Sequence, residues 1–233
     1  MLISHRLVRP NLLQLHSPGV KFFVLRTDDR LAVVDSGFIG GRAHLFHALE
    51  KVGWAKLPIT NILVTHGHLD HILNVGRLAK KTGAKIWAPP EDEAHYQGRP
   101  DYSGFAHVTG LLEKLGRPAL GFKTFSPDRP LTDGLELDLW GGLCVISLPG
   151  HTRGHCGFYS EKHRLLFSAD LFASYPKLSH RPPAFFNHDS AENKTSIAKA
   201  LALDLTGVLP NHGDRAAPEV HLRRLRKLQT RWT

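Results

Sequence analysis

The sequence has few cysteines and no long apolar run. Only Cys144 and Cys156 occur in 233 residues, so a disulfide framework does not hold the fold together. We expect both thiols to be reduced and packed, with a role near a binding turn as the alternative. No apolar run approaches the length of a bilayer span. Residues 1–10 are basic but lack an uninterrupted apolar segment before a cleavage site, which predicts residence in the cytoplasm and no membrane partner.

Common catalytic signatures are also missing from the chain. It contains no Gly-x-Ser-x-Gly turn for a serine nucleophile and no glycine-rich, lysine-bearing loop that would cradle phosphate. No Gly/Ser-rich or Pro-rich linker divides it, so we predict one domain covering residues 1–233. The hydrophobic share of 42% and the charged share of 22% are those of an ordinary globular protein.

The chain carries an excess of positive charge, with a formal net charge of +9 and a pI near 9.8. Such an excess favours acidic ligands or nucleic acid as partners. Much of it lies in residues 221–232, where Leu222, Leu225, Leu228 or Gln229, and Trp232 recur at helical spacing. This pattern predicts a helix that docks by an apolar stripe and exposes its arginines. We therefore favour a solvated basic face over a nucleic-acid contact surface.

Short apolar runs alternate with turns and helical patterns. We first predict a hairpin of strands at 20–26 and 31–35, a helix at 41–52, a buried strand at 59–65, a helix ending near Lys81 and a strand at 85–88. Residues 91–125 form a looser region of short helical pieces and loops. Strands at 135–140, 143–148, 156–160 and 164–168 then resemble an antiparallel meander, followed by a helix at 191–203 and a strand at 207–209. This order indicates an α/β protein of two packed sheets with helices outside.

The densest group of metal-ligand side chains is the run from His66 to His71, directly after the predicted strand 59–65. By chance, about 0.004 matches to the pattern His-x-His-x-Asp-His are expected in a chain of this composition. His66 and His68 lie two positions apart on an extended backbone and project to the same side. Asp70 and His71 turn away from that pair and could serve a neighbouring ion. The spacing therefore favours two metal ions over one.

Three further positions complete a candidate ligand set. A two-metal site built from His and carboxylate groups needs about seven protein ligands, each placed where a strand ends. His151 follows an apolar strand in a turn fixed by Pro and Gly, Asp170 ends the apolar run 165–169, and His212 follows the strand 207–209. Most other histidines, among them His5, His44 and His47, are expected to be ordinary surface or packing residues.

In these motifs the chain resembles the metallo-β-lactamase superfamily of hydrolases, in the right order and over nearly its whole length. The turn Val33-Val34-Asp35-Ser36-Gly37 is similar to the first motif of that family. The resemblance implies an αββα sandwich of two mixed sheets flanked by helices. It also implies one metal on His66, His68 and His151, a second on Asp70, His71 and His212, and Asp170 bridging both. Asp35 would hold the loop without binding metal.

The chain departs from the family pattern in the turns that carry the later ligands. Asn211 stands where the family often has Gly, and Arg153 replaces a common Pro. His155 matches a position often occupied by His in the thioester-hydrolysing members. It is either functional or a histidine that orients a ligand through a hydrogen bond.

The resemblance implies a hydrolase that uses a metal-bridging hydroxide on a carboxylic ester, thioester or lactone. Two divalent ions, zinc in first place with iron or manganese as alternatives, would supply that nucleophile. Asp70 is predicted to orient the attacking water or relay a proton, and Tyr175 to assist the carbonyl oxygen as in lactone-hydrolysing members. The alternatives are a phosphodiesterase or nuclease of the same fold and a single-iron persulfide dioxygenase. The branch, glyoxalase II-like or lactonase-like, stays open.

Substrate choice must depend on the loops at 91–125 and 171–187. The second loop carries many aromatic residues, namely Phe172, Tyr175, Phe185 and Phe186. They suit either an apolar wall for a small-molecule substrate or packing beneath a long loop. The sequence decides neither the physiological substrate nor the oligomeric state.

Overall fold

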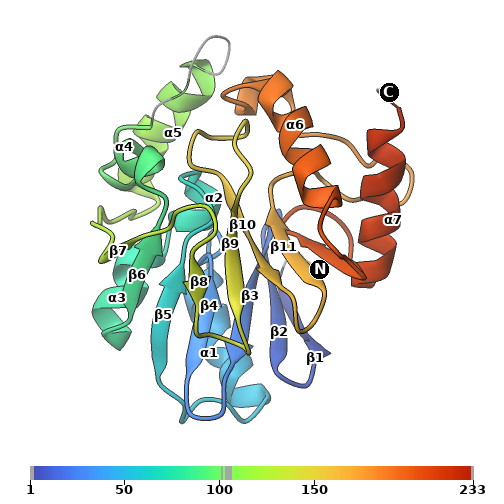
Figure 1. Cartoon of the computed structure of the whole chain (residues 1–233). Helices are drawn as coiled ribbons and strands as arrows, with labels where there is room; N and C mark the ends of the chain where they lie inside the picture. Colours follow the sequence, from blue (N-terminus) through green and yellow to red (C-terminus); the bar gives the residue numbers. More distant parts are fainter. Residues whose placement is uncertain (1–2, 101, 103–106, 232–233) are drawn as a thin grey trace. The chain divides into compact units, whose positions relative to one another are not determined.

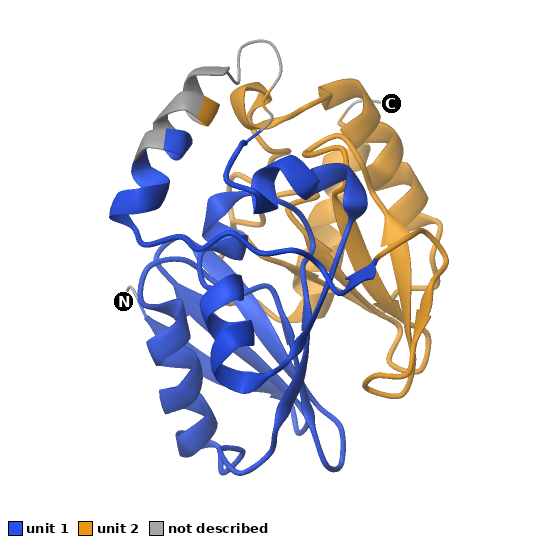
Figure 2. Cartoon of the chain, turned by 90° about the vertical axis from the view of Figure 1, so that its left-hand side faces the viewer, with its two compact units in different colours: residues 1–101, 111–130 blue, residues 102–110, 131–233 orange. Residues whose placement is uncertain are grey.

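The computed structural model describes residues 3–100, 102 and 107–231. The chain divides into two compact units (Figure 2). Unit 1 comprises residues 1–101 and 111–130, and unit 2 comprises residues 102–110 and 131–233. Each unit contains one sheet. That both units belong to a single domain stays a prediction.

Unit 1 is built on a seven-stranded mixed sheet in which the strands follow one another in chain order (Figure 1). The first four strands pair antiparallel, and β4 to β7 pair parallel. Their bounds are β1 Ser4–Arg9, β2 Leu12–Ser17, β3 Val20–Arg26, β4 Leu31–Val34, β5 Ile59–Leu63, β6 Lys85–Ala88 and β7 Arg129–Pro130. The predicted hairpin and the buried strand before His66 are therefore confirmed.

The hairpin of β1 and β2 was not predicted from the sequence. β1 is an edge strand with basic residues, and its side chains are half-buried or, at Leu7, exposed, so it lacks the clear alternation that marks a half-buried strand. β2 is almost fully buried and pairs with both β1 and β3. An edge strand joins its sheet mainly through backbone hydrogen bonds, and the residue types of the strand do not predict these.

The helices of unit 1 include α1 Gly41–Lys51, α2 Leu69–Ile72, α3 Val75–Thr82 and α4 Glu93–Tyr96, with a 3-10 turn η1 at Pro90–Asp92. The prediction of one helix up to Lys81 was wrong, because two helices meet at Asn74. The side-chain NH2 of Asn74 donates to the carbonyls of Ser36, Gly37 and Phe38 at 2.9–3.1 Å. This tertiary contact fixes the break.

The looser region at 91–125 also contains α5 His107–Ala119, whose residues divide between the two units. Residues 101 and 103–106 of this predicted loop lie outside the described residues. Nowhere in the described ranges is a helix both long and apolar enough to cross a membrane.

Unit 2 is built on a five-stranded sheet in the order β12-β11-β10-β9-β8. β8 to β11 form the predicted antiparallel meander, and β12 adds parallel to β11. The strands are β8 Glu136–Leu137, β9 Leu143–Ser147, β10 Cys156–Ser160, β11 Leu165–Ala169 and β12 Gly207–Pro210. The helices are α6 Ser190–Leu201 and α7 Pro218–Gln229, with a 3-10 turn η3 at Ala184–Phe186.

The predicted docking of the last helix is confirmed. Leu222, Leu225 and Leu228 of α7 are buried in one core with Ile197 and Ala200 of α6. The exposed positions of α7 include its basic residues Arg223, Arg226 and Lys227. Trp232 lies outside the described residues. The apolar stripe therefore attaches α7 to unit 2, while most of its positive charge faces solvent.

Candidate metal centre

The three histidines of the first motif lie together in unit 1, just beyond β5. The ring centroids of His66 and His68 are 4.9 Å apart, and those of His66 and His71 are 4.1 Å apart. His66 and His71 are fully buried, and His68 is 6% exposed. The chain leaves β5 extended and enters α2 at His68, the N-cap residue. A strand end followed at once by a short helix thus gathers the three rings.

Asp35 orients two of these rings from the end of β4. Its backbone has a φ of 60°, and its carboxylate accepts a hydrogen bond from Nδ1 of His71 at 2.9 Å. The Thr65 hydroxyl donates to the same carboxylate and accepts from Nδ1 of His66 at 3.0 Å. With Nδ1 of each ring committed as a donor, Nε2 is the nitrogen that carries the lone pair a metal needs.

The backbone between these histidines is held by acidic side chains of unit 1. The N–H of Gly67 donates to Asp92 at 2.7 Å, and the N–H of Leu69 donates to Glu113 at 2.7 Å. A Cβ at Gly67 would lie 2.5 Å from the Cβ of His95, so only glycine fits there. Glu113 in turn pairs with the buried Arg117 at 3.1 Å. The loop is therefore fixed by partners that the sequence motif does not contain.

Asp70 occupies the first turn of α2 with about a third of its side chain exposed. Its Oδ2 lies 3.6 Å from Nε2 of the buried His71. A carboxylate oxygen and an imidazole nitrogen therefore stand side by side, as the sequence predicts for ligands of a common ion.

In unit 2, the carboxylate of Asp170 lies between two predicted ligands. Its Oδ2 is 3.5 Å from Nε2 of His151 and 2.9 Å from Nε2 of His212. Asp170 directly follows β11, His151 follows β9, and His212 follows β12. The structure thus brings together the three ligands predicted from separate strand ends in this unit.

His151 is held in one orientation by the loop before α6. Its Nδ1 lies 2.9 Å from the side-chain oxygen of Asn187, which accepts the ring hydrogen and leaves Nε2 toward Asp170. The preceding Gly150 has a φ of 120°, and a Cβ there would lie 2.3 Å from the backbone nitrogen of Asn193. Sequence reasoning missed Asn187, because no spacing rule links it to a turn 36 positions earlier.

His155 uses both ring nitrogens inside the protein. Nδ1 donates to the carbonyl of Leu148 at 2.8 Å, and Nε2 accepts from the backbone N–H of Asp170 at 3.1 Å. The side chain is fully buried. These contacts favour the second of the two predicted roles, because a histidine holding the Asp170 backbone has no nitrogen left for a metal.

The segment after His212 is tied to α7. A Cβ at Gly213 would lie 2.3 Å from the carbonyl oxygen of Ser174, so glycine is required there. Asp214 forms a two-point ion pair with Arg224, at 2.8 and 3.0 Å. Although burial works to raise the pKa of Asp214, hydrogen bonds from Arg224 and the N–H of Ala216 outweigh it and hold that pKa below its ordinary value.

The aromatic loop at 171–187 divides into buried and exposed residues. Phe172 is fully buried in the core of unit 2. Tyr175, Phe185 and Phe186 are 40%, 47% and 38% exposed, and the ring of Tyr175 stacks on His180. Packing therefore accounts for Phe172, while the other three remain available for contact with a substrate.

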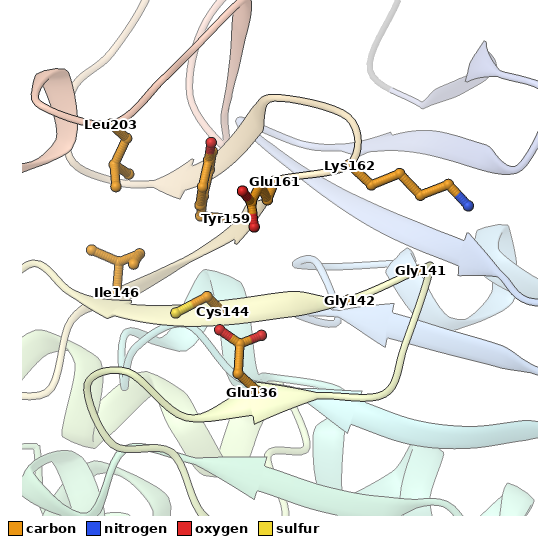
Figure 3. A pocket seen from close by; sticks show the side chains of 9 residues that line it. All are labelled: Glu136, Gly141, Gly142, Cys144, Ile146, Tyr159, Glu161, Lys162 and Leu203. Carbon is orange, nitrogen blue, oxygen red and sulfur yellow. The ribbon is translucent and has the colours of Figure 1, made fainter.

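A pocket of about 530 Å³ lies in unit 2, and none of the predicted ligands lines it (Figure 3). The side chains of Glu136 and Cys144 point toward one another in it. Burial first, and then the hydrogen bond with Glu136, raises the pKa of the Cys144 thiol to about 11. Both cysteines are free thiols in this structure.

Residues 19–212 match the family described as the Metallo-beta-lactamase superfamily. The chain is 30% identical over 143 residues to hydroxyacylglutathione hydrolase GloC of Haemophilus influenzae, a match that covers 60% of this chain and 60% of that protein. It is 26% identical over 199 residues to the probable metallo-hydrolase YflN of Bacillus subtilis, covering 78% and 74%.

A solved structure, the metallo-beta-lactamase family protein TTHA1429 from Thermus thermophilus, covers 97% of this chain and 80% of its own. It superposes with a TM-score of 0.73 at 21% identity. The predicted fold class, an α/β protein of two mixed sheets with flanking helices, is confirmed.

Proposed function

The chain belongs to the metallo-beta-lactamase superfamily of hydrolases, and we propose that it hydrolyses a thioester or a related carboxylic ester or lactone with two divalent metal ions. The proposed ligands of the first ion are His66, His68 and His151, and those of the second are Asp70, His71 and His212. Asp170 is proposed to bridge the two. Among the described residues, the same seven are candidates to hold a metal ion.

The donor set fits such ions, and the observation that carries the proposal is the orientation of the rings. Asp35, Thr65 and Asn187 each engage the Nδ1 of a proposed ligand, so that Nε2 is the coordinating nitrogen. Neutral imidazoles oriented in this way, together with carboxylates, suit zinc, iron and manganese alike. We place zinc first, with iron or manganese as alternatives.

When bound, such metal ions make hydroxide available near neutral pH and polarise the substrate carbonyl. Asp70, with part of its carboxylate accessible, accepts a hydrogen bond from the attacking water and takes up its proton. Tyr175 carries an accessible phenol that donates a hydrogen bond to the substrate carbonyl oxygen. The exposed rings of Phe185 and Phe186 supply an apolar contact for the acyl group.

A thioester stands first among the substrates because GloC is named for hydrolysis of an acylglutathione. A phosphodiester is the second candidate, favoured by the net charge of +9. The solvent-facing arginines of α7 support a basic surface, but the sequence offers no evident nucleic-acid-binding insertion. A single-iron persulfide dioxygenase is the third, and it would consume oxygen.

The test is metal analysis of the purified protein joined to a screen of thioesters, lactones, phosphodiesters and β-lactams, with oxygen uptake monitored. We expect two metal ions per chain and turnover of a thioester. His66→Ala should abolish both metal binding and turnover. The matched control His163→Ala, at a half-buried histidine that is not a proposed ligand, should keep both metal binding and turnover. Less than one metal per chain, with every activity unchanged in His66→Ala, would overturn the proposal.

A further inference from the structure

Three histidines outside the proposed metal centre gather on one side of unit 1. His44 and His47 lie on α1 three positions apart, and His5 lies on the edge strand β1. The ring centroid of His5 is 5.3 Å from that of His44 and 6.3 Å from that of His47. One ring thus stands next to two others from a different element.

The placement follows from the fold. Across the hairpin, His5 pairs with Leu15, and Leu15 lies in the core cluster that also contains Leu45 and Ala48 of α1. Residues opposite one another on antiparallel strands point to the same face, so His5 faces α1. Residues three apart on a helix are also neighbours, which puts His44 and His47 on a common surface.

His44 is the least accessible member of this cluster. Its side chain is 8% exposed, and its Nε2 is buried with no hydrogen-bond partner among the described residues. A buried imidazole nitrogen without a partner is costly, because it gives up its hydrogen bonds to water and gains none in return. A metal ion would satisfy that nitrogen.

The spacing of the rings is close to that of the predicted ligands. His66 and His68 have centroids 4.9 Å apart, against 5.3 Å for His5 and His44. The cluster is not among the groups of described residues whose donor atoms already lie within 4.8 Å of one another. Closing it requires rotation of the half-buried His5 and of the exposed His47.

We propose that His5, His44 and His47 form a separate binding site for one borderline divalent ion such as Zn²⁺, Ni²⁺ or Cu²⁺. Imidazole is a preferred ligand for these ions, and water would complete the coordination at the solvent side near His47. The bound ion would tie the edge strand β1 to α1. It would thereby stabilise β1, which as the edge strand of the sheet pairs through its backbone with β2 alone.

The test is a calorimetric titration of the purified protein with NiCl2, with the resident metal in place. After dialysis, elemental analysis of both nickel and the resident metal is done. We expect one additional nickel per chain with the resident metal unchanged. His5→Gln and His47→Gln should each weaken the binding of this additional nickel by at least about 10–100-fold. That is the loss of metal affinity seen when even an indirect partner of a metal ligand is removed.

The matched control is His163→Gln, a half-buried histidine of unit 2 that contacts Trp140 and should leave the titration unchanged. His5 and His47 are preferred for substitution because the buried His44 could alter folding. The inference fails if the wild type binds no additional nickel, if nickel only replaces the resident metal, or if both variants titrate like the wild type. None of these outcomes depends on hydrolytic activity.

Discussion

The Oδ2 atom of Asp35 accepts a hydrogen bond from Nδ1 of His71 at 2.9 Å, and both side chains are fully buried. The Oδ1 atom of the same carboxylate accepts hydrogen bonds from the hydroxyl and from the backbone N–H of Thr65. One acidic residue therefore positions two histidines that come later in the chain, His66 through Thr65 and His71 directly.

Asp35→Asn is expected to weaken metal binding by about 10–100-fold, because an amide cannot accept hydrogen bonds as a carboxylate does and releases the two rings. Metal content after dialysis against a graded series of chelator concentrations measures this loss. Asp128→Asn, an exposed carboxylate paired with Lys85, serves as the control and should bind metal normally. Normal metal retention in Asp35→Asn would show that the rings orient without it.

Asp70→Asn is expected to abolish turnover, with a loss of about 10²–10⁴-fold in kcat if Asp70 accepts the proton of the attacking water. The metal content of the same sample must be measured, because Asp70 is also a proposed ligand and the second ion can be lost with it. A variant with full metal and a normal rate would remove Asp70 from the mechanism.

His155→Ala is expected to lower the free energy of unfolding by about 1–3 kcal/mol, because the carbonyl of Leu148 and the N–H of Asp170 lose their buried partner. It should also lower metal content, since the backbone that carries Asp170 is no longer held. Denaturant unfolding and elemental analysis measure the two effects. A stability loss with unchanged metal content would limit His155 to a structural role.

The ion pair of Asp214 and Arg224 should make stability depend on pH. Because the pKa of Asp214 is lower in the folded chain than in the unfolded chain, its contribution is complete above the unfolded value and disappears as pH falls through the folded value. Arg224→Gln should therefore cost about 1 kcal/mol at neutral pH, a figure limited by partial exposure, and less at low pH, where only the hydrogen bonds from Arg224 to Ser174 are lost. Unfolding free energies of both proteins across that pH range provide the measurement, and a constant difference would contradict the pairing.

Cys144 is expected to react slowly with iodoacetamide at pH 8, by about two orders of magnitude compared with an ordinary thiol, because a pKa of about 11 leaves little thiolate. Glu136→Gln should speed the reaction, since it removes a negative charge that raises this pKa. Peptide mass spectrometry distinguishes Cys144 from the buried Cys156. Equal rates in the wild type and Glu136→Gln would assign the slow reaction to burial alone. The control Glu219→Gln removes an exposed carboxylate elsewhere and should react like the wild type.

Several features of the fold could be predicted because they depend on local pattern. The apolar runs that became β3 and β11 are buried along nearly their whole length, and those that became β5 and β9 are mostly buried, so their composition marks them plainly. The stripe of Leu222, Leu225 and Leu228 predicts the docked face of α7 for the same reason. In contrast, β1 and the break at Asn74 depend on partners distant in sequence, and no local pattern encodes them.

By itself, the sequence determined which residues are the candidate ligands and that each follows a strand, because ligand chemistry and strand periodicity are properties of short segments. The tertiary structure decided how those candidate ligands are oriented: Asp35, Thr65 and Asn187 each engage the Nδ1 atom of a candidate histidine, and His155 holds the backbone of Asp170. It also decided that His5 meets His44, two histidines that the sequence treats as ordinary. Hydrogen bonds and ring contacts form between residues that only chain folding brings together, so spacing along the chain cannot specify them.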